Sequence, residues 1–339
     1  MRIFVFVNQV HEIGFRQTTA LLIAAFARLD HEVYLANVDG LSVHCSDLVD
    51  PLLISDAIKL EIEGKERSSR TVAEFVATVP NASFQTIEIG AQDTIVIRTN
   101  PGRDLSRSAV HSLFLESCQI AKTRGVRVIN DPDRLSFFAS KAAISVLPEK
   151  YRPKMLVTNN PESAANFIRN SNDDFVVKPL QGSRGENVIR VDSTSGNLKK
   201  MLSQYNGKSL VVQQFIRSDE LGDKRVVVLN GRLLEHDEHI GGIQRVPAEG
   251  DFRANLHAGG TARPLRLTYD QRESALAAAA ILQNVGIQLA GIDLIGNKVI
   301  EFNVFSTGGL YNANEFSKFD FTEMIARDIL DFEKPEETK

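Results

Sequence analysis

The sequence has no tryptophan and only two cysteines and four methionines among its 339 residues. The cysteines, Cys45 and Cys118, form neither a CxxC pair nor a metal-ligand spacing, which argues against a disulfide framework and a cysteine-based zinc site. We interpret both as small buried hydrophobic side chains. A reducing cytoplasm is therefore the expected location.

Long apolar runs and an excess of one charge are also missing. No run reaches the ~20 residues that a membrane helix needs, and the apolar start over residues 1–7 predicts a buried strand rather than a signal segment. Lys and Arg number 39 against 43 Asp and Glu, a net charge of -4. We therefore expect no membrane and no nucleic-acid partner. The length predicts two or three domains.

The N-terminal third alternates apolar β-branched runs with Ala- and Leu-rich stretches, which predicts a parallel sheet with crossover helices and an α/β fold class. The predicted strands are 3–7, 31–36, 93–98 and 126–130, and the predicted helices are 18–29 and 106–123. Residues 37–92 are placed only loosely, with 61–74 as a helix or a mobile insertion. Substrates of such sheets bind at the C-terminal strand edges, where Arg98 lies.

After about residue 133 the regular alternation of predicted strands and helices ends. We predict a helix over 134–147 that carries Lys141, a long active-site loop over 241–260 that holds five glycines, and a hairpin that turns through Gly296 and Asn297. The remaining predicted strands are 175–179, 187–191, 210–215, 224–229 and 232–235, and the remaining helices are 270–285 and 322–330.

Three oxygen-bearing side chains lie on the last predicted hairpin. Glu301 and Asn303 are two residues apart on one strand, so both face the same way, and Asp293 on the partner strand can face that side too. Such a set suits Mg²⁺, which takes few carboxylates and leaves positions for phosphate oxygens. The alternative is a solvent-facing polar side of the sheet, which the apolar residues flanking each polar one disfavour. The hairpin is therefore predicted to hold a metal ion.

Lys178 ends an apolar strand and is followed by a loop that contains Gly182 and Gly185. A lysine in this place must reach solvent or find an anion, and the glycines let backbone amides approach phosphates. The loop is not a Walker A motif, and its GxxG spacing is common. Lys141 is a second candidate cation, against the alternative of an ordinary surface lysine.

Further cations lie at 222–225 (Gly-Asp-Lys-Arg) and in the predicted long loop, which carries Arg245, Arg253 and Asn255. Phosphoryl transfer needs cations that offset the developing charge. The alternative for each residue is a solvated loop charge.

In this order, these elements resemble the ATP-grasp superfamily and, within it, the bacterial glutathione synthetase family. The resemblance runs from about residue 93 to 310. The matching segments are Lys-Pro-Leu at 178–180, Gly-Asp-Lys-Arg-Val at 222–226, Arg-Ala-Asn-Leu-His-Ala-Gly-Gly at 253–260, Gly-Ile-Asp-Leu-Ile-Gly at 291–296 and Glu-Phe-Asn-Val at 301–304. Weaker matches lie at 98–101 and 129–132.

The resemblance implies an α/β protein with an ATP-grasp fold. It implies an N-terminal Rossmann-like parallel-sheet domain over 1–130, an α+β lid over 131–212 and a C-terminal subdomain with the metal site over 213–339. It also implies an ATP-dependent carboxylate–amine ligase. A donor carboxylate takes the γ-phosphate to give an acylphosphate, and an acceptor amine then displaces phosphate. The expected product is glutathione, from γ-glutamylcysteine and glycine, and a different peptide or small acid is the alternative.

Roles follow by resemblance. ATP is expected to contact Lys141, Lys178, Gly182, Ser183, Gly185, Gln214, Phe215, Ile216 and Asp223, with 214–216 as the hinge at adenine. Mg²⁺, for which Mn²⁺ is expected to substitute, is assigned to Asp293, Glu301 and Asn303. Phosphate or the acylphosphate is assigned to Arg225, Arg253 and Asn255 as catalytic residues. Substrate is assigned to Arg98, which would anchor a carboxylate, and to Ser306, Thr307 and Gly308.

The sequence departs from the family pattern at two places. Arg184 and Glu186 replace small residues of the family's lid loop. The turn at 306–309 (Ser-Thr-Gly-Gly) also differs, and because this turn is expected to shape the substrate pocket, it leaves the donor and the acceptor open. A nucleotide-binding module without catalysis is a further alternative, but it predicts missing metal or phosphate residues, and these are present. The expected partners are small molecules and, on family analogy, a second copy of the chain.

Overall fold

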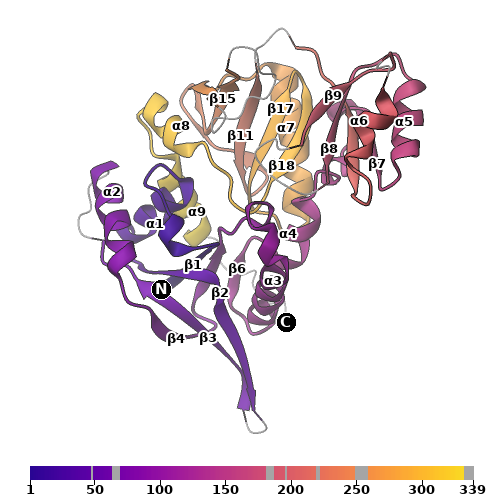
Figure 1. Cartoon of the computed structure of the whole chain (residues 1–339). Helices are drawn as coiled ribbons and strands as arrows, with labels where there is room; N and C mark the ends of the chain where they lie inside the picture. Colours follow the sequence, from indigo (N-terminus) through magenta and orange to yellow (C-terminus); the bar gives the residue numbers. More distant parts are fainter. Residues whose placement is uncertain are drawn as a thin grey trace, which may run out of the picture. The chain divides into compact units, whose positions relative to one another are not determined.

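The computed structural model describes residues 1–46, 49–62, 69–180, 187–194, 197–218, 222–248 and 259–331. It divides into two compact units (Figure 1). The first unit comprises the described parts of Met1–Asp133, Leu234–Asp237 and Phe305–Lys339, and the second comprises those of Arg134–Leu233 and Glu238–Val304. The domain limits predicted at residues 130 and 212 stay predictions.

The first unit contains a six-stranded sheet in the order β4-β3-β2-β1-β5-β6. Its strands are β1 (Arg2–Val7), β2 (Glu32–Ser46), β3 (Val49–Lys59), β4 (Gln85–Ile89), β5 (Thr94–Ile97) and β6 (Arg127–Ile129). β1, β2, β5 and β6 pair in parallel, which confirms the predicted parallel core. β3 lies in the segment 37–92 that the sequence placed only loosely, and it runs antiparallel to both β2 and β4. Buried Val38, Leu41, Leu53 and Ala57 give this added hairpin an apolar side.

The helices of this unit are α1 (Thr18–Arg28), α2 (Ser69–Thr78), α3 (Ser108–Thr123), α8 (Leu310–Ser317) and α9 (Phe321–Asp331). Short 3₁₀ turns lie at Val10–Glu12, Val79–Asn81, Pro101–Arg103 and Leu105–Arg107, and β13 is Glu235–His236. The helices predicted at 18–29, 106–123 and 322–330 are confirmed. Cys118 is buried on α3 as expected, but Cys45 is exposed near the end of β2, so its assignment to the core is wrong.

The second unit contains an antiparallel four-stranded sheet in the order β7-β10-β8-β9. Its elements are β7 (Met155–Thr158), α5 (Pro161–Arg169), β8 (Phe175–Pro179), β9 (Ile189–Val191), α6 (Leu198–Ser203) and β10 (Leu210–Gln214). Ile168 of α5 and Leu202 of α6 are fully buried with Phe175 and Val177 of β8, so the two helices and the sheet share one core.

A second sheet of this unit follows the path β16-β15-β11-β17-β18, with β12 added to β11. Its strands are β11 (Asp223–Leu229), β12 (Arg232–Leu233), β15 (Gly242–Val246), β16 (Thr261–Pro264), β17 (Leu289–Ile295) and β18 (Lys298–Asn303); β14 is His239–Ile240. α7 (Tyr269–Asn284) contacts β17 and β18. Thr268 and Gln271 begin this helix with a capping box. The predicted hairpin at 290–303 is confirmed.

Two predictions for this unit are wrong. The helix expected over 134–147 ends early: α4 (Pro132–Phe138) is followed by a turn that holds Lys141 and then by short turns at Ala143–Val146 and Glu149–Tyr151. The Ser140 hydroxyl accepts the amide of Ala142, so a side chain replaces the helical bond there. The long loop expected over 241–260 begins instead as β15, whose Ile243 and Val246 are buried. None of the described helices is long and apolar enough to cross a membrane.

Candidate active site

The hairpin β17–β18 places two carboxylates side by side. Asp293 of β17 lies opposite Glu301 of β18, and Asn303 lies two residues further along β18, opposite Gly291. Directly opposite residues of an antiparallel pair share a face, so the three side chains lie on one face, as the spacing predicts. Asp293 is 2% exposed, whereas Glu301 and Asn303 are half-buried. A strand irregularity follows Asp293.

Asp293 is the centre of a buried chain of charges. Arg225 of β11 donates Nε to Oδ1 and Nη2 to Oδ2, both at 2.7 Å. Arg245 of β15 donates Nη2 to Asp293 Oδ2 at 2.8 Å and two further bonds of 2.6 Å to the carboxylate of Asp223. The register of three neighbouring strands creates this chain, because Asp223 lies opposite Arg245 and Arg225 opposite Asp293.

This pairing sets the ionisation of the acids. Burial by itself raises the pKa of Asp293, but the charges of Arg225 and Arg245 outweigh it and hold that pKa well below the ordinary value. Burial raises the pKa of Asp223 above its usual range, against the opposing charge of Arg245. Asp293 is therefore a carboxylate at neutral pH. Arg245, which the sequence offered only as a candidate cation in a long loop, joins the two acids because β15 pairs with β11.

Two lysines lie near the same acids. Lys178 of β8 is 7% exposed, and burial lowers its pKa to about 8, while the charges of Glu301 and Asp293 oppose that shift. Lys141 is 9% exposed, and burial lowers its pKa too, again against the charge of Glu301. The structure therefore brings both predicted phosphate-binding lysines into the electrostatic environment of the candidate metal ligands.

The predicted adenine hinge follows β10. Gln214 ends this strand, and the amide of Phe215 donates to Asp174 O at 2.8 Å. The guanidinium of Arg190 lies 4.1 Å from the centre of the Phe215 ring. Ile216 lies near the Gly296 turn of the hairpin, 3.6 Å from the position that a Cβ would take there. The predicted hinge and the candidate metal hairpin are thus neighbours.

The first unit brings together the predicted substrate residues, although about 200 positions separate them in the sequence. Arg98 Nη2 donates to the carbonyl of Thr307 at 2.8 Å, and Asn100 Nδ2 donates to Ser306 Oγ at 3.4 Å. A Cβ at Gly308 would meet nothing within 4 Å. Their assignment to substrate stays a prediction.

Five further predicted residues, Gly182, Ser183, Gly185, Arg253 and Asn255, lie outside the described residues.

The donor set of the hairpin fits a hard divalent cation. Two carboxylates and one amide offer oxygen ligands on one face. No group of three or more His, Cys, Asp and Glu side chains within the described ranges could hold a metal by itself. A cation at this hairpin would share Asp293 with the two arginines.

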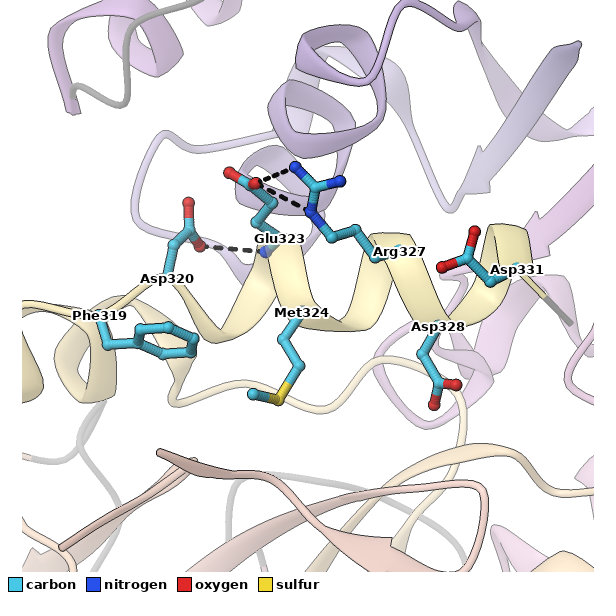
Figure 2. A pocket seen from close by; sticks show the side chains of 7 residues that line it. All are labelled: Phe319, Asp320, Glu323, Met324, Arg327, Asp328 and Asp331. Atoms are coloured by element: carbon cyan, nitrogen blue, oxygen red, sulfur yellow. Dashed lines mark hydrogen bonds and ion pairs between the residues drawn. The ribbon is translucent and has the colours of Figure 1, made fainter. Parts of the chain in front are cut away.

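A separate hollow lies along α9 in the first unit (Figure 2). Four of its seven lining residues are carboxylates, and Arg327 pairs with Glu323 at 2.7 Å. None of the predicted site residues lines it, so we assign it no role. The lining residues are Phe319, Asp320, Glu323, Met324, Arg327, Asp328 and Asp331.

Two family models match the chain. Residues 140–318 match the ATP-grasp domain of prokaryotic glutathione synthetase, and residues 1–136 match its N-terminal domain. The chain belongs to the prokaryotic glutathione synthetase family. The glutathione synthetase of Brucella melitensis biotype 1 is 28% identical over 312 residues, which cover 91% of this chain and 90% of that protein. The Agrobacterium fabrum glutathione synthetase is 30% identical over 255 residues, which cover 73% of this chain and 76% of that protein.

Solved structures share the fold. The D-cycloserine synthetase DcsG superposes with a TM-score of 0.61 at 16% identity, covering 96% of this chain and 99% of that one. A peptide-associated ATP-grasp ligase from Chryseobacterium gregarium superposes with a TM-score of 0.62 at 14% sequence identity, and the match covers 98% of each chain. The chain thus has the ATP-grasp fold, and its family makes it an ATP-dependent ligase.

Proposed function

We propose that this ligase joins γ-glutamylcysteine to glycine and forms glutathione, ADP and phosphate. The observation that carries the proposal lies in the second unit. There the charge of Glu301 favours the protonated form of both Lys141 and Lys178, and Glu301 lies opposite Asp293 on the hairpin. Two cations beside two acids on one face suit a metal-bound triphosphate. The match to both family models, over nearly all of the chain, supports the glutathione product.

Asp293, Glu301 and Asn303 would hold Mg²⁺, with Mn²⁺ as a substitute, and the cation would neutralise charge on the triphosphate. Lys141 and Lys178 would donate to phosphate oxygens, and 214–216 would line the adenine. Gly182, Ser183 and Gly185, which lie outside the described residues, stay proposed contacts of the phosphates.

Arg225 would stabilise the phosphate that is transferred and released, together with Arg253 and Asn255. Two bonds to Asp293 fix its guanidinium, so little reorganisation is needed when negative charge develops. Asp223, proposed from the resemblance as a nucleotide contact, is bound through both oxygens to Arg245. We therefore propose that Asp223 acts by orienting Arg245.

The test is product analysis. The purified chain with ATP, Mg²⁺, γ-glutamylcysteine and glycine should release phosphate and form glutathione in equal amounts, and neither should appear without glycine or without the divalent cation. The proposal fails if this pair gives no glutathione while another acid and amine release phosphate.

A ligase that adds an amino acid to a different peptide or small acid is the second candidate. The Ser-Thr-Gly-Gly turn at 306–309 favours it, because the turn departs from the family pattern where the substrate pocket is expected. The same assay with alternative acids decides between them. Self-association stays a proposal by family analogy, to be tested by light scattering.

A further inference from the structure

Arg190 and Phe215 form a cation–π pair at the predicted hinge. The guanidinium carbon of Arg190 lies 4.1 Å from the centre of the Phe215 ring, a distance at which the face of an aromatic ring attracts a cation. Arg190 belongs to β9, and Phe215 directly follows β10. β8 lies between these two strands in the sheet. The contact therefore reaches across a whole strand, and both of its members have to be held in place.

Asp174, which directly precedes β8, holds both members of the pair. Its backbone carbonyl accepts the amide of Phe215 at 2.8 Å, and its carboxylate accepts a hydrogen bond from Nη2 of Arg190. The same carboxylate oxygen accepts Nη2 of Arg217 at 3.0 Å. These hydrogen bonds, that of Arg190 first, hold the pKa of Asp174 below its ordinary value. Asp174 is therefore an anion at neutral pH, and it fixes the backbone of Phe215 directly and the ring through Arg190.

The pair lies on the face of the sheet that carries Lys178. Phe175 and Val177 of β8 belong to the core that the sheet shares with α5 and α6. Side chains alternate along a strand, so Val176 and Lys178 point to the opposite face. Arg190 lies directly opposite Val176 and shares that face. Two residues of a strand span roughly 7 Å, so a nucleotide can extend from the pair to the lysine that is proposed to bind its phosphates.

Folding by itself does not explain this arrangement. The side chain of Arg190 is 45% exposed, and an exposed ion pair adds little to stability. A planar guanidinium can lie on an aromatic face while one of its nitrogens bonds to a carboxylate, which an ammonium group cannot reproduce. The effect of the three residues is to fix the orientation of the Phe215 ring beside the segment 214–216.

We propose that Asp174 and Arg190 are positioning residues for the nucleotide base, and that they act through Phe215. This inference rests on the proposed place of adenine at 214–216 and deepens it, because it names residues outside the hinge that set how tightly the base is held. The base end of the nucleotide is then controlled separately from the phosphate end at Lys178.

The first experiment measures binding without any reaction. Calorimetry follows the non-hydrolysable ATP analogue AMPPNP with Mg²⁺ and without acid or amine. Arg190→Met should raise its dissociation constant by about 3- to 30-fold, the range that fits loss of a cation–π contact. Arg190→Lys should lose less, and Asp174→Asn should also weaken binding. Arg217→Met is the matched control, because Arg217 shares Asp174 but is 79% exposed, and it should change the constant by less than about twofold.

The second experiment is a double-mutant cycle with Phe215→Leu. If Arg190 acts through the ring, Arg190→Met should weaken AMPPNP no further in the Phe215→Leu background. Steady-state kinetics, with the acid and amine that the chain uses, should show a raised KM for ATP and an unchanged kcat for Arg190→Met, because the lost contact holds substrate and transition state equally. A purely structural role predicts no such division.

Three results would overturn the inference: AMPPNP binding to Arg190→Met within twofold of wild type, an equal loss in the Phe215→Leu background, or a lowered kcat at unchanged KM. Ile216→Ala tests the place of adenine itself. If it leaves AMPPNP binding unchanged, adenine does not lie at 214–216, and that proposal and this inference fail together. If Ile216→Ala weakens binding and Arg190→Met does not, only this inference fails. Because binding is measured without acid or amine, failure to form glutathione does not affect the result.

Discussion

Asp293 and Arg225 form a two-point ion pair, with both oxygen–nitrogen distances at 2.7 Å. The two residues lie directly opposite each other on neighbouring strands, so the sheet register builds the pair. Asp293 therefore has two functions at one place, since it anchors cations that the fold buries and it is proposed to bind a metal ion. Glu301, across the hairpin, is also proposed to bind the metal ion, but it acts on the buried lysines Lys141 and Lys178 through its charge alone.

Asp293→Asn should lose both functions. The substitution leaves Arg225 and Arg245 buried without their shared acid, and breaking a buried pair in this way costs roughly 3–5 kcal/mol. Urea unfolding should show a loss of that size, and phosphate release should fall by more than about 100-fold, as loss of a metal ligand predicts.

Glu301→Gln is the matched comparison, because Glu301 is half-buried and has no ion pair within 4 Å among the described residues. Its activity should fall as far as that of Asp293→Asn, while it should lose clearly less unfolding free energy, because Glu301 acts on Lys141 and Lys178 through its charge alone. Equal destabilisation by both variants would contradict the separate roles.

Arg245→Lys should lose much of its activity although the substitution keeps the positive charge. Arg245 contacts Asp223 through two nitrogens and reaches Asp293 with the same side chain, and an ammonium cannot reproduce this planar geometry. Steady-state kinetics should show kcat/KM lower by about 10- to 100-fold, which corresponds to ~1.4–2.8 kcal/mol. Lys150→Arg, at an exposed ion pair with Glu273, is the control and should stay active. Wild-type kinetics for Arg245→Lys would remove Arg245 from the site.

The parts of the fold that the sequence predicted are those with a local pattern. The β17–β18 hairpin combines a Gly-Asn turn with apolar strands, so its bounds and the common face of Asp293 and Glu301 were predictable. The early end of the helix expected over 134–147 could not be predicted, because it depends on the Ser140 side chain, which accepts the Ala142 amide in place of a helical backbone bond. The antiparallel strand β3 lacks a sharp turn signal and depends on long-range pairing with β2.

The residues of the candidate site that lie within one short motif could be predicted from the sequence. Those that come together only through the pairing of distant strands could not. Asp293, Glu301 and Lys178 came from short motifs. Arg245 joins them only because β15 pairs with β11, and the proximity of Thr19 to Arg98 depends on how α1 packs beside β5. Sequence spacing carries no information about either contact.

Lys178 should make stability depend on pH. Its pKa is lowered to about 8 in the folded chain by burial, against 10.5 for an ordinary lysine. Between these values the unfolded chain binds a proton that the folded chain lacks, so stability rises with pH from about 8 to 10.5 and the penalty is complete below that window. Lys178→Met removes this dependence. As the pH rises across the window, the unfolding free energy of the wild type should increase by up to about 3 kcal/mol relative to that of the variant.

The control for this experiment is Lys199→Met, which removes an exposed lysine of α6. Urea titrations of the three proteins at pH 7, 9 and 10 are sufficient. A wild-type chain whose stability follows that of Lys178→Met at all three values would contradict the lowered pKa.

Gly222 should be required for the register that creates the charge chain. It precedes Asp223 with a φ of +81°, and a Cβ there would lie 1.8 Å from the backbone oxygen of Arg245. Gly207 has a similar φ of +72° but nothing within 4 Å of the same position. Gly207→Ala should therefore cost only the left-handed backbone strain, about 1–2 kcal/mol, while Gly222→Ala adds an overlap with backbone that costs roughly 1–3 kcal/mol more. Because the overlap pushes Arg245 away from Asp223, only Gly222→Ala should also lose ligase activity. Equal stability and activity of the two alanine variants would show that β11 and β15 tolerate separation at this end.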